Sequence, residues 1–311
     1  MTIDPMAEVV QLLRLGIRFS KLVECSGSWK IHREGTGDPF YCTVLDGRCH
    51  LTTGGQPTTI LQAGDFVLVP AMHSILNESP DGPEDGTTME PIEIGDGRFR
   101  VGNVDAPADL TMHIGHCHFA SPDANLLVQL LPNVIVAHAA PRLAILMQLI
   151  WDETSARRPA REIVLERLLE LMLIEAMRSG GEMASARGLA RALADNRLSA
   201  ALRAVHARPQ HPWTIAEIAE EAALSRSAFF TRFSRIVGVP PMEYLLAWRM
   251  ALAKRLLCNR ELGLEQVAER VGYSSASTFS VAFARCTGVT PARYGREVRA
   301  TSFSFVPPSP P

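Results

Sequence analysis

The spacing of apolar side chains changes character along this chain. Between residues 21 and 119, short apolar or alternating runs are separated by Gly, Pro, Asp and Asn. Runs of this length bounded by turn residues predict a small all-β barrel or sandwich. The clearest runs are Phe40–Leu45, His50–Thr53, Phe66–Pro70 and Leu110–Phe119. Residues 5–16 predict a short amphipathic helix before this region, and the acidic residues 78–97 predict a long surface loop within it.

Residues 141–177 have a helical period instead, with a break near Arg158 and Pro159. The second helix carries a broad apolar stripe, which must be buried either within the subunit or against a partner helix. Burial in a dimer interface is the favoured interpretation. The stripe consists of Ile163, Leu165, Leu168, Leu169, Met172, Leu173 and Ala176.

The rest of the chain divides by composition. Small polar residues after the helical pair predict a flexible linker, the following stretch has a helical pattern, and the proline-rich end cannot continue a helix. The prediction is an α+β multidomain protein. Its parts are a β-barrel at 1–140, a helical dimerisation segment at 141–178, a linker at 179–187, an all-α domain at 188–299 and a disordered tail at 300–311.

Composition fits a globular protein of two domains in the cytoplasm. The chain has 311 residues, of which 47% are hydrophobic and 21% charged. No apolar run reaches the roughly 18 residues that a membrane span requires, and the N-terminus lacks a signal sequence. The six cysteines form no C-x-x-C pair, so we expect free thiols and no zinc ribbon.

Charge is distributed unevenly between the two parts. Residues 187–299 hold 17 Lys and Arg against 9 Asp and Glu, whereas residues 1–186 hold 14 against 24. A basic module joined to an acidic one predicts that only the C-terminal part meets a polyanion such as nucleic acid.

A candidate helix-turn-helix lies at residues 213–238. Thr214 begins a capping box that opens one helix, and Ser225 can cap a second helix after a short turn. The small Ala219 allows the helices to cross closely, and Phe229 supplies the inner face of the second helix.

The same pattern recurs at residues 264–288, where Phe279 follows Phe229 by 50 residues. Gly272 can adopt the left-handed turn conformation at little cost. Between the units, Met242–Leu257 predicts a helix of about 16 residues, hence roughly 24 Å long. Such a spacer could place two recognition helices about 34 Å apart, one turn of DNA.

Two stretches resemble the DNA-binding domain of the AraC/XylS family of transcription regulators. They read HARPQHPWTIAEIAEEAALSRSAFFTRFSRIVGVPPMEYLLAWRMALAKRLL and VAERVGYSSASTFSVAFARCTGVTPARYGRE, and the second follows the family signature closely. The resemblance covers about a third of the chain, from about residue 197 to 297. It implies double-stranded promoter DNA as a partner and RNA polymerase as a transient one.

The first turns of each second helix face base edges in a helix-turn-helix. The outward positions are Arg226, Ser227, Phe230 and Thr231 in the first unit and Ser277, Ser280 and Val281 in the second. All except Arg226 and Ser280 also match the family's base-contacting positions by resemblance. The second set has little hydrogen-bonding capacity, so we expect it to read DNA by apolar contact or shape. The predicted phosphate contacts are Arg232, Arg235, Arg249, Arg285 and Arg293.

The β-rich segment resembles the cupin-like sensor domain that precedes this DNA-binding module in one branch of the family. The motifs are FYCTVLDGRCHL, LQAGDFVLVPAMHSILN and HIGHCHF. A metal-binding cupin offers two histidines and a carboxylate on one strand and a third histidine on a later one. Here only His50 and His73 lie near such positions, so no metal or other cofactor is expected.

A cluster of His113, His116, Cys117 and His118 has two interpretations. On a strand, His113 and Cys117 share one face and the other two histidines the opposite face. Cys117, alone or together with Cys25, is a candidate redox sensor because a neighbouring imidazolium favours the thiolate. Alternatively, Cys117 is a buried structural residue, and the barrel binds a small molecule without cysteine chemistry.

Together these features predict a dimeric, non-enzymatic, sequence-specific transcription regulator. A small-molecule or oxidant signal at the N-terminal domain would change the placement of the two DNA-binding domains. One alternative is a cupin-type metal-dependent enzyme with a DNA-binding appendage. Another is an architectural DNA-binding protein without regulation. The effector, the operator and the sign of regulation stay open.

Overall fold

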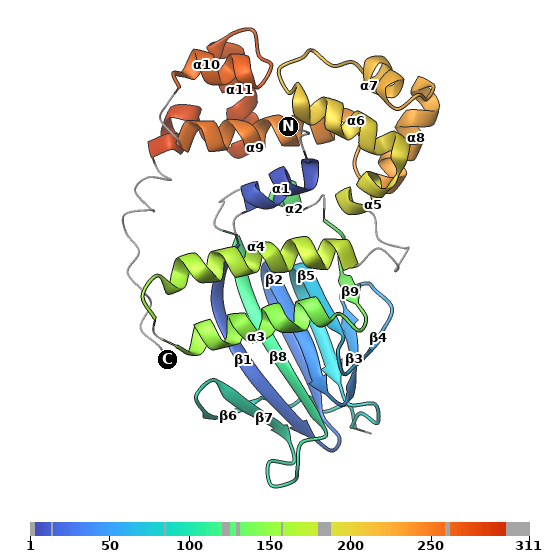
Figure 1. The fold of residues 1–311 in the computed structure, drawn as a ribbon, viewed down its shortest axis with the longest axis vertical. Coiled ribbons are helices and arrows are strands. Elements are labelled where there is room, and N and C mark those ends of the chain that lie inside the picture. Colours follow the sequence, from blue (N-terminus) through green and yellow to red (C-terminus); the bar gives the residue numbers. More distant parts are fainter. Residues whose placement is uncertain are drawn as a thin grey trace. The chain divides into compact units, whose positions relative to one another are not determined.

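The computed structural model describes residues 4–13, 15–83, 85–119, 125–128, 131–156, 158–179, 188–258 and 262–296. The chain forms two compact units (Figure 1). The sheet unit comprises residues 13–122 and 131–191, and the helical unit comprises residues 1–12, 123–130 and 192–311. The predicted linker at 179–187 and tail at 300–311 lie almost entirely outside the described residues.

One curved, almost wholly antiparallel sheet builds the sheet unit. Its hydrogen-bonded order is β4-β3-β5-β2-β8-β1-β7-β6, β9 also pairs with β5, and only β1 and β7 run parallel. The strands are β1 (Leu15–Ser26), β2 (Lys30–Asp46), β3 (Arg48–Thr53), β4 (Thr59–Gln62), β5 (Phe66–Glu78), β6 (Ile92–Gly95), β7 (Arg98–Gly102), β8 (Leu110–Phe119) and β9 (Ile135–Ala137). The four predicted runs are all strands. The loop prediction for 78–97 is wrong at β6, which pairs with β7.

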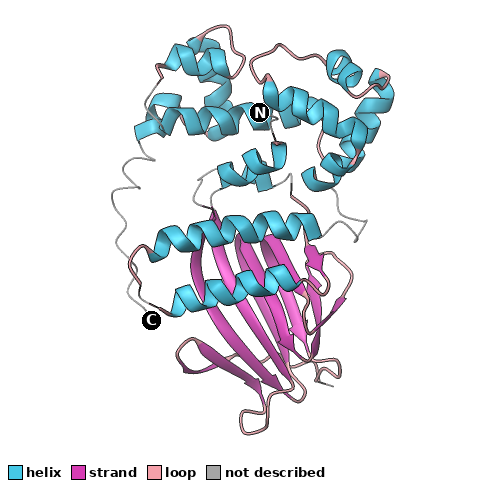
Figure 2. Ribbon diagram, viewed as in Figure 1, coloured by secondary structure: helices cyan, strands magenta, loops and turns pink. Residues whose placement is uncertain are grey.

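The two faces of the sheet bury different residues. One face encloses an apolar core that includes Val23, Phe40 and Met112. Two helices, α3 (Pro141–Ser155) and α4 (Arg161–Ser179), lie on the other face (Figure 2). On that side the ring of His113 stacks on Trp151 of α3, with ring centroids 5.1 Å apart.

The apolar stripe of α4 is used mainly within the chain. Its residues Leu165, Leu169, Met172, Leu173 and Ala176 are buried in the described chain. Ile163, by contrast, is 62% exposed. The expected break between the helices is present, because α3 ends at Ser155 and α4 begins at Arg161. Most of the stripe therefore stabilises the packing of the subunit itself rather than forming an interface with a partner.

The helical unit gathers segments from three parts of the sequence. Its helices are α1 (Pro5–Leu13), α2 (Asn125–Val128), α5 (Leu189–Ala194), α6 (Asn196–Ala207), α7 (Ile215–Glu221), α8 (Arg226–Val237), α9 (Pro241–Cys258), α10 (Leu264–Arg270) and α11 (Ala276–Thr287). The predicted helix at 5–16 ends earlier, because β1 begins at Leu15. Within the described residues, every helix falls short of the length and apolar character that a bilayer span requires.

A buried histidine joins α1 to the rest of the helical unit. Nδ1 of His206 lies 2.8 Å from Oε2 of Glu8, and Nε2 lies 2.6 Å from Oη of Tyr244. The imidazole also stacks on Trp248 at 4.0 Å. Burial lowers the pKa of His206. A neutral ring that donates from Nδ1 to Glu8 and accepts from Tyr244 at Nε2 has a partner at each nitrogen.

This arrangement predicts that the helical unit loses stability in mild acid. The folded state resists protonation of His206, whereas the unfolded chain binds a proton below the ordinary histidine pKa of about 6.5. The stabilisation is therefore complete above that pH and declines as the pH falls through it. Urea unfolding followed by circular dichroism between pH 7.5 and 5.5 measures the effect.

His206→Gln should weaken this pH dependence, and His211→Gln, which changes a more exposed histidine on a loop of the same unit, should keep it. An equal slope in the wild type and in His206→Gln would refute the assignment.

Candidate nucleic-acid interface

Two helix pairs in the helical unit have the predicted helix-turn-helix form. In the first pair, the backbone N–H of Glu217 donates to Oγ1 of Thr214 at 3.2 Å, and that of Thr214 donates to the Glu217 carboxylate at 2.7 Å. This capping box begins α7, and the hydrogen bonds from Thr214 lower the pKa of Glu217. Ser225 and Ser275 cap α8 and α11 by accepting from the backbone three residues on. The capping predictions are confirmed.

The turn in each pair depends on one residue in the left-handed region. Ala223 has φ +50° and Gly272 has φ +82°. In both turns the next N–H donates back to the first helix, from Leu224 to Ala219 at 3.0 Å and from Tyr273 to Ala268 at 2.9 Å. The second turn is one residue longer, because Ala223 and Gly272 are 49 positions apart whereas Ser225 and Ser275 are 50 apart.

A single spacer helix, α9, connects the two pairs. Its 18 residues give a length of about 27 Å. The α7–α8 pair lies toward one end of α9 and the α10–α11 pair toward the other (Figure 1). The arrangement therefore offers two recognition helices held by one rigid element.

The predicted base-contacting side chains lie almost entirely on the surface. Phe230 is 42% exposed and Val281 73% exposed, values that are high for large apolar side chains. Ser280 differs, because it is half-buried and its hydroxyl donates to the carbonyl of Ala276 at 2.7 Å. The other exposed candidates are Arg226, Ser227, Thr231 and Ser277.

Two further residues in these first turns, Ala228 and Thr278, are exposed but are not among the predicted contacts. The capping serines provide the signal that could have found them, because each fixes the third position of its helix.

The five predicted phosphate arginines fall into two groups. Arg235, Arg285 and Arg293 are exposed. Arg232 instead donates from Nε to Asp195 at 2.9 Å, and Arg249 donates to two backbone carbonyls. These internal bonds occupy the guanidinium donors, which weighs against a phosphate role for Arg232 and Arg249.

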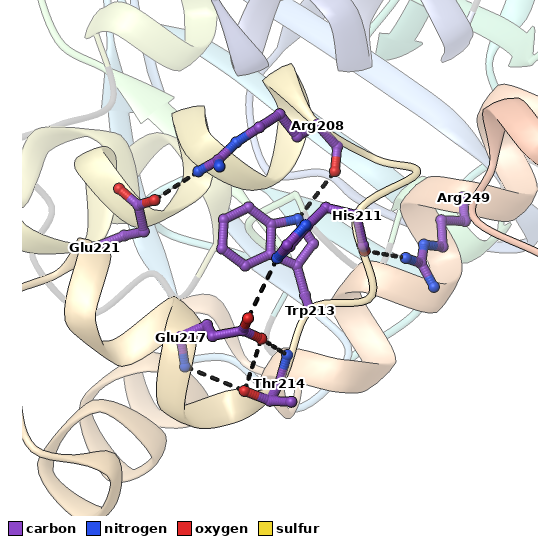
Figure 3. A network of polar contacts seen from close by, with 7 residues as sticks. All are labelled: Arg208, His211, Trp213, Thr214, Glu217, Glu221 and Arg249. Atoms are coloured by element: carbon purple, nitrogen blue, oxygen red, sulfur yellow. Dashed lines mark hydrogen bonds and ion pairs between the residues drawn. The ribbon is translucent and has the colours of Figure 1, made fainter.

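Arg249 belongs to a polar network that braces the loop before α7 (Figure 3). Its guanidinium donates to the carbonyls of Pro209 at 2.8 Å and His211 at 2.7 Å, and burial lowers its pKa. At the other side of the loop, the indole of Trp213 donates to the carbonyl of Arg208 at 3.0 Å. The network thereby ties α9 to the start of the first helix-turn-helix.

Arg208 and His211 complete this network (Figure 3). Arg208 forms an ion pair with Glu221 at 2.6 Å, and its guanidinium lies 4.7 Å from the Trp213 ring. Nε2 of His211 lies 3.3 Å from the capping carboxylate of Glu217. Both ends of α7 are thus fixed by side chains from the loop that precedes it.

The cysteines proposed for redox sensing are buried in the sheet unit. Cys25 and Cys117 both have no exposed surface, and burial raises the pKa of each thiol. A high thiol pKa disfavours the reactive thiolate. As predicted, His113 and Cys117 share one face of β8, while His116 lies on the opposite face, where burial lowers its pKa to about 4.

The candidate metal ligands do not come together. His73 is exposed, and His50 lies on β3 between the inward residues Cys49 and Leu51. Among the described residues, no group of three or more His, Cys, Asp or Glu side chains could hold a metal ion. The donor set therefore does not fit the metal site of a cupin enzyme.

Two protein-family models match this chain. A family model described as cupin matches residues 4–180, and a model described as helix-turn-helix domain matches residues 218–297.

Similar proteins match over nearly the whole length. A putative AraC-like transcription regulator of Streptomyces antibioticus is 33% identical over 302 residues, covering 94% of this chain and 98% of its own. Another from Streptomyces lividans is 30% identical and covers 94% and 97%. The HTH-type transcriptional regulator AlkR of Acinetobacter baylyi is 28% identical and covers 94% and 99%.

The two turns predict opposite effects of small substitutions. Ala223→Gly should stabilise the chain, because a left-handed conformation costs about 1–2 kcal/mol for residues with a Cβ. Gly272→Ala should destabilise it by at least as much, since the added Cβ would lie 2.6 Å from Nη2 of Arg249 and 3.0 Å from the Gln210 carbonyl. Urea unfolding of both variants tests this, and a loss of stability in Ala223→Gly would contradict the strained turn.

Proposed function

Because the chain belongs to the family of AraC-like transcription regulators and carries a cupin domain before its helix-turn-helix domain, we propose that it binds specific promoter DNA as a homodimer under the control of a small molecule. The observation that carries this proposal is the pair of exposed recognition helices on one spacer. The protein would act in the cytoplasm, with RNA polymerase as a transient partner.

Base recognition is assigned mainly to α8. Arg226 can bond a guanine edge, while Phe230 and the methyl group of Thr231 can contact a thymine methyl. On α11, Ser277 and Val281 give weaker readout, and Ser280 contributes less because its hydroxyl is already bonded within the helix.

Backbone contacts are assigned to exposed arginines. Arg235 and Arg285 lie near the ends of α8 and α11, and Arg293 follows α11. Phosphate contacts of this kind fix register on the duplex without reading sequence.

Dimerisation is assigned to the outer sides of α3 and α4. Large apolar side chains are exposed there, although the inner stripe of α4 is already buried. They are Ile145 and Leu149 on α3 and Ile163, Val164 and Leu171 on α4. A two-fold pairing of these helices would present two DNA-binding units to a two-fold site.

The signal is assigned to a bound small molecule rather than to an oxidant. Buried thiols of raised pKa are poor sensors, which argues against Cys25 and Cys117. The enzyme alternative is disfavoured because the similar proteins are transcription regulators and the cupin metal donors do not fit.

The experiment that tests the whole proposal is binding of the full chain to fragmented genomic DNA of its own source at fixed salt, with and without reductant. A recurring motif with half-sites supports the regulator. Salt-sensitive binding without a motif supports the architectural alternative. If the set of bound DNA fragments changed with reductant, redox sensing by cysteines would again be the favoured signal.

Substitutions on α8 separate base from phosphate contacts. Thr231→Ala should lose about 1–3 kcal/mol on the specific site and little on random DNA, whereas Arg235→Ala should weaken both alike and reduce the salt slope. Arg48→Ala, at an exposed position on β3 of the sheet unit, is the matched control for charge. Fluorescence anisotropy at several salt concentrations measures the effects, and an unchanged ratio of specific to random affinity in Thr231→Ala would exclude the base contact.

A charge on α4 should weaken the dimer. Leu171 is 53% exposed, so Leu171→Asp should leave the subunit folded but weaken association by at least about tenfold, because a desolvated charge is costly in an interface. Val104→Asp, in a loop of the sheet unit, is the matched control. Sedimentation equilibrium gives the dissociation constants of the dimers. Equal values for the wild type and Leu171→Asp would mean that the dimer interface does not include this part of α4.

A further inference from the structure

Arg249 lies near the middle of α9, between the residues that pack against the two helix-turn-helix pairs. Tyr244, earlier on α9, contacts Phe233 of α8, and Met250, directly after Arg249, shares a buried cluster with α11. Arg249 is half-buried, which is costly for a charged side chain unless polar partners surround it. The identity of those partners therefore shows which elements Arg249 holds together.

Two of the partners belong to the loop that leads into α7 (Figure 3). Nε of Arg249 donates to the carbonyl of Pro209 at 2.8 Å, and Nη2 donates to that of His211 at 2.7 Å. One planar, rigid guanidinium thus binds two carbonyls of the same loop. Because this loop continues directly into the Thr214 cap, the start of the first helix-turn-helix is fixed relative to α9.

The same guanidinium also packs against the turn of the second helix-turn-helix. A Cβ added to Gly272 would lie 2.6 Å from Nη2 and 2.9 Å from Cζ of Arg249, so the arginine fills the space that a side chain would need there. That Cβ would also lie 3.0 Å from the carbonyl oxygen of Gln210, in the loop of the first pair. Burial raises the pKa of Tyr273, and the positive charge of Arg249 opposes the rise. The loop of the first pair, the turn of the second pair and the spacer helix therefore meet at one side chain.

This junction restricts the relative motion of the two pairs. The carbonyls and the glycine around the guanidinium belong to the main chain, so they cannot yield by a change of side-chain rotamer. Moving the first pair relative to the second would break a hydrogen bond to Arg249 or open a gap beside Gly272, and both cost free energy. The two recognition helices are therefore held in one relative placement by more than their separate contacts with α9.

We propose that Arg249 is a positioning residue, which fixes the relative placement of α8 and α11 and so sets the number of base pairs between the two stretches of DNA that these helices read. The inference rests on the proposed function, because it requires both helices to contact specific DNA. One base pair moves the second stretch by about 3.4 Å along the duplex and by about 35° around it. A rigid pair of recognition helices therefore accepts one spacing, whereas a loosely joined pair accepts several.

The test is selection of DNA by the full chain from a pool of duplexes that carry a random stretch of about 30 base pairs, or three turns of the duplex. In each half-site, the wild type should recover a motif of two parts at one fixed spacing. Arg249→Met keeps an unbranched side chain but has no donor, so it should recover the same two parts at several spacings. Arg249→Lys keeps the charge but lacks the planar fork, so we expect an intermediate spread.

Fluorescence anisotropy on the selected site gives the size of the effect. One base pair inserted between the two parts should weaken wild-type binding at least about tenfold, because the base contacts of one recognition helix are lost. The same insertion should weaken the binding of Arg249→Met less than about threefold. Arg203→Met, at an exposed position on α6, is the matched control and should keep the wild-type ratio. A residue that served stability alone would instead lower the affinity equally at every spacing.

Two results would overturn the inference: a single spacing recovered by Arg249→Met, or several spacings recovered by the wild type. Circular dichroism shows whether the variants are folded. If Arg249→Met is unfolded, the decision passes to Arg249→Lys, for which the spacing of the wild type would overturn the inference. A wild type that recovers no motif at all rejects the proposed function instead, and the inference with it.

Discussion

The two helix-turn-helix pairs depend on one constraint, which is that both share their buried side chains with the same helix, α9. Phe233 of α8 meets Tyr244 of α9 edge-on at 5.6 Å. At the other end, Phe279 and Phe283 of α11 share a buried cluster with Met250 of α9. Because close-packed side chains leave little freedom, the orientation of each recognition helix follows from its fit to the same rigid helix.

Polar contacts then fix the elements around α9. Arg249 holds the loop before α7, and His206 joins α1 to Tyr244. Hydrogen bonds of this kind are strong in surroundings of low polarity only when every group is satisfied. The inward side chains thus stabilise the fold, while the outward side chains of α8 and α11, such as Thr231 and Val281, stay exposed.

The sheet unit has a corresponding division between its faces. One face packs against α3 and α4, and the other encloses the apolar core. The strands β1 and β8 are neighbours in the sheet. The sequence before β1 and after β8 continues into α1 and α2, which belong to the helical unit.

The sequence by itself determined the features that depend on near neighbours. The capping residues Thr214, Ser225 and Ser275, the left-handed Gly272 and the repeat of 50 residues could be predicted because caps, turns and helical periodicity involve residues a few positions apart. Tertiary structure decided the rest. It paired Arg232 with Asp195, bonded Arg249 to backbone carbonyls and buried most of the α4 stripe within the chain. It also brought Glu8 to His206 across 198 positions. Such contacts depend on which surfaces meet when the chain folds, and the pattern of residues a few positions apart does not determine which surfaces these are.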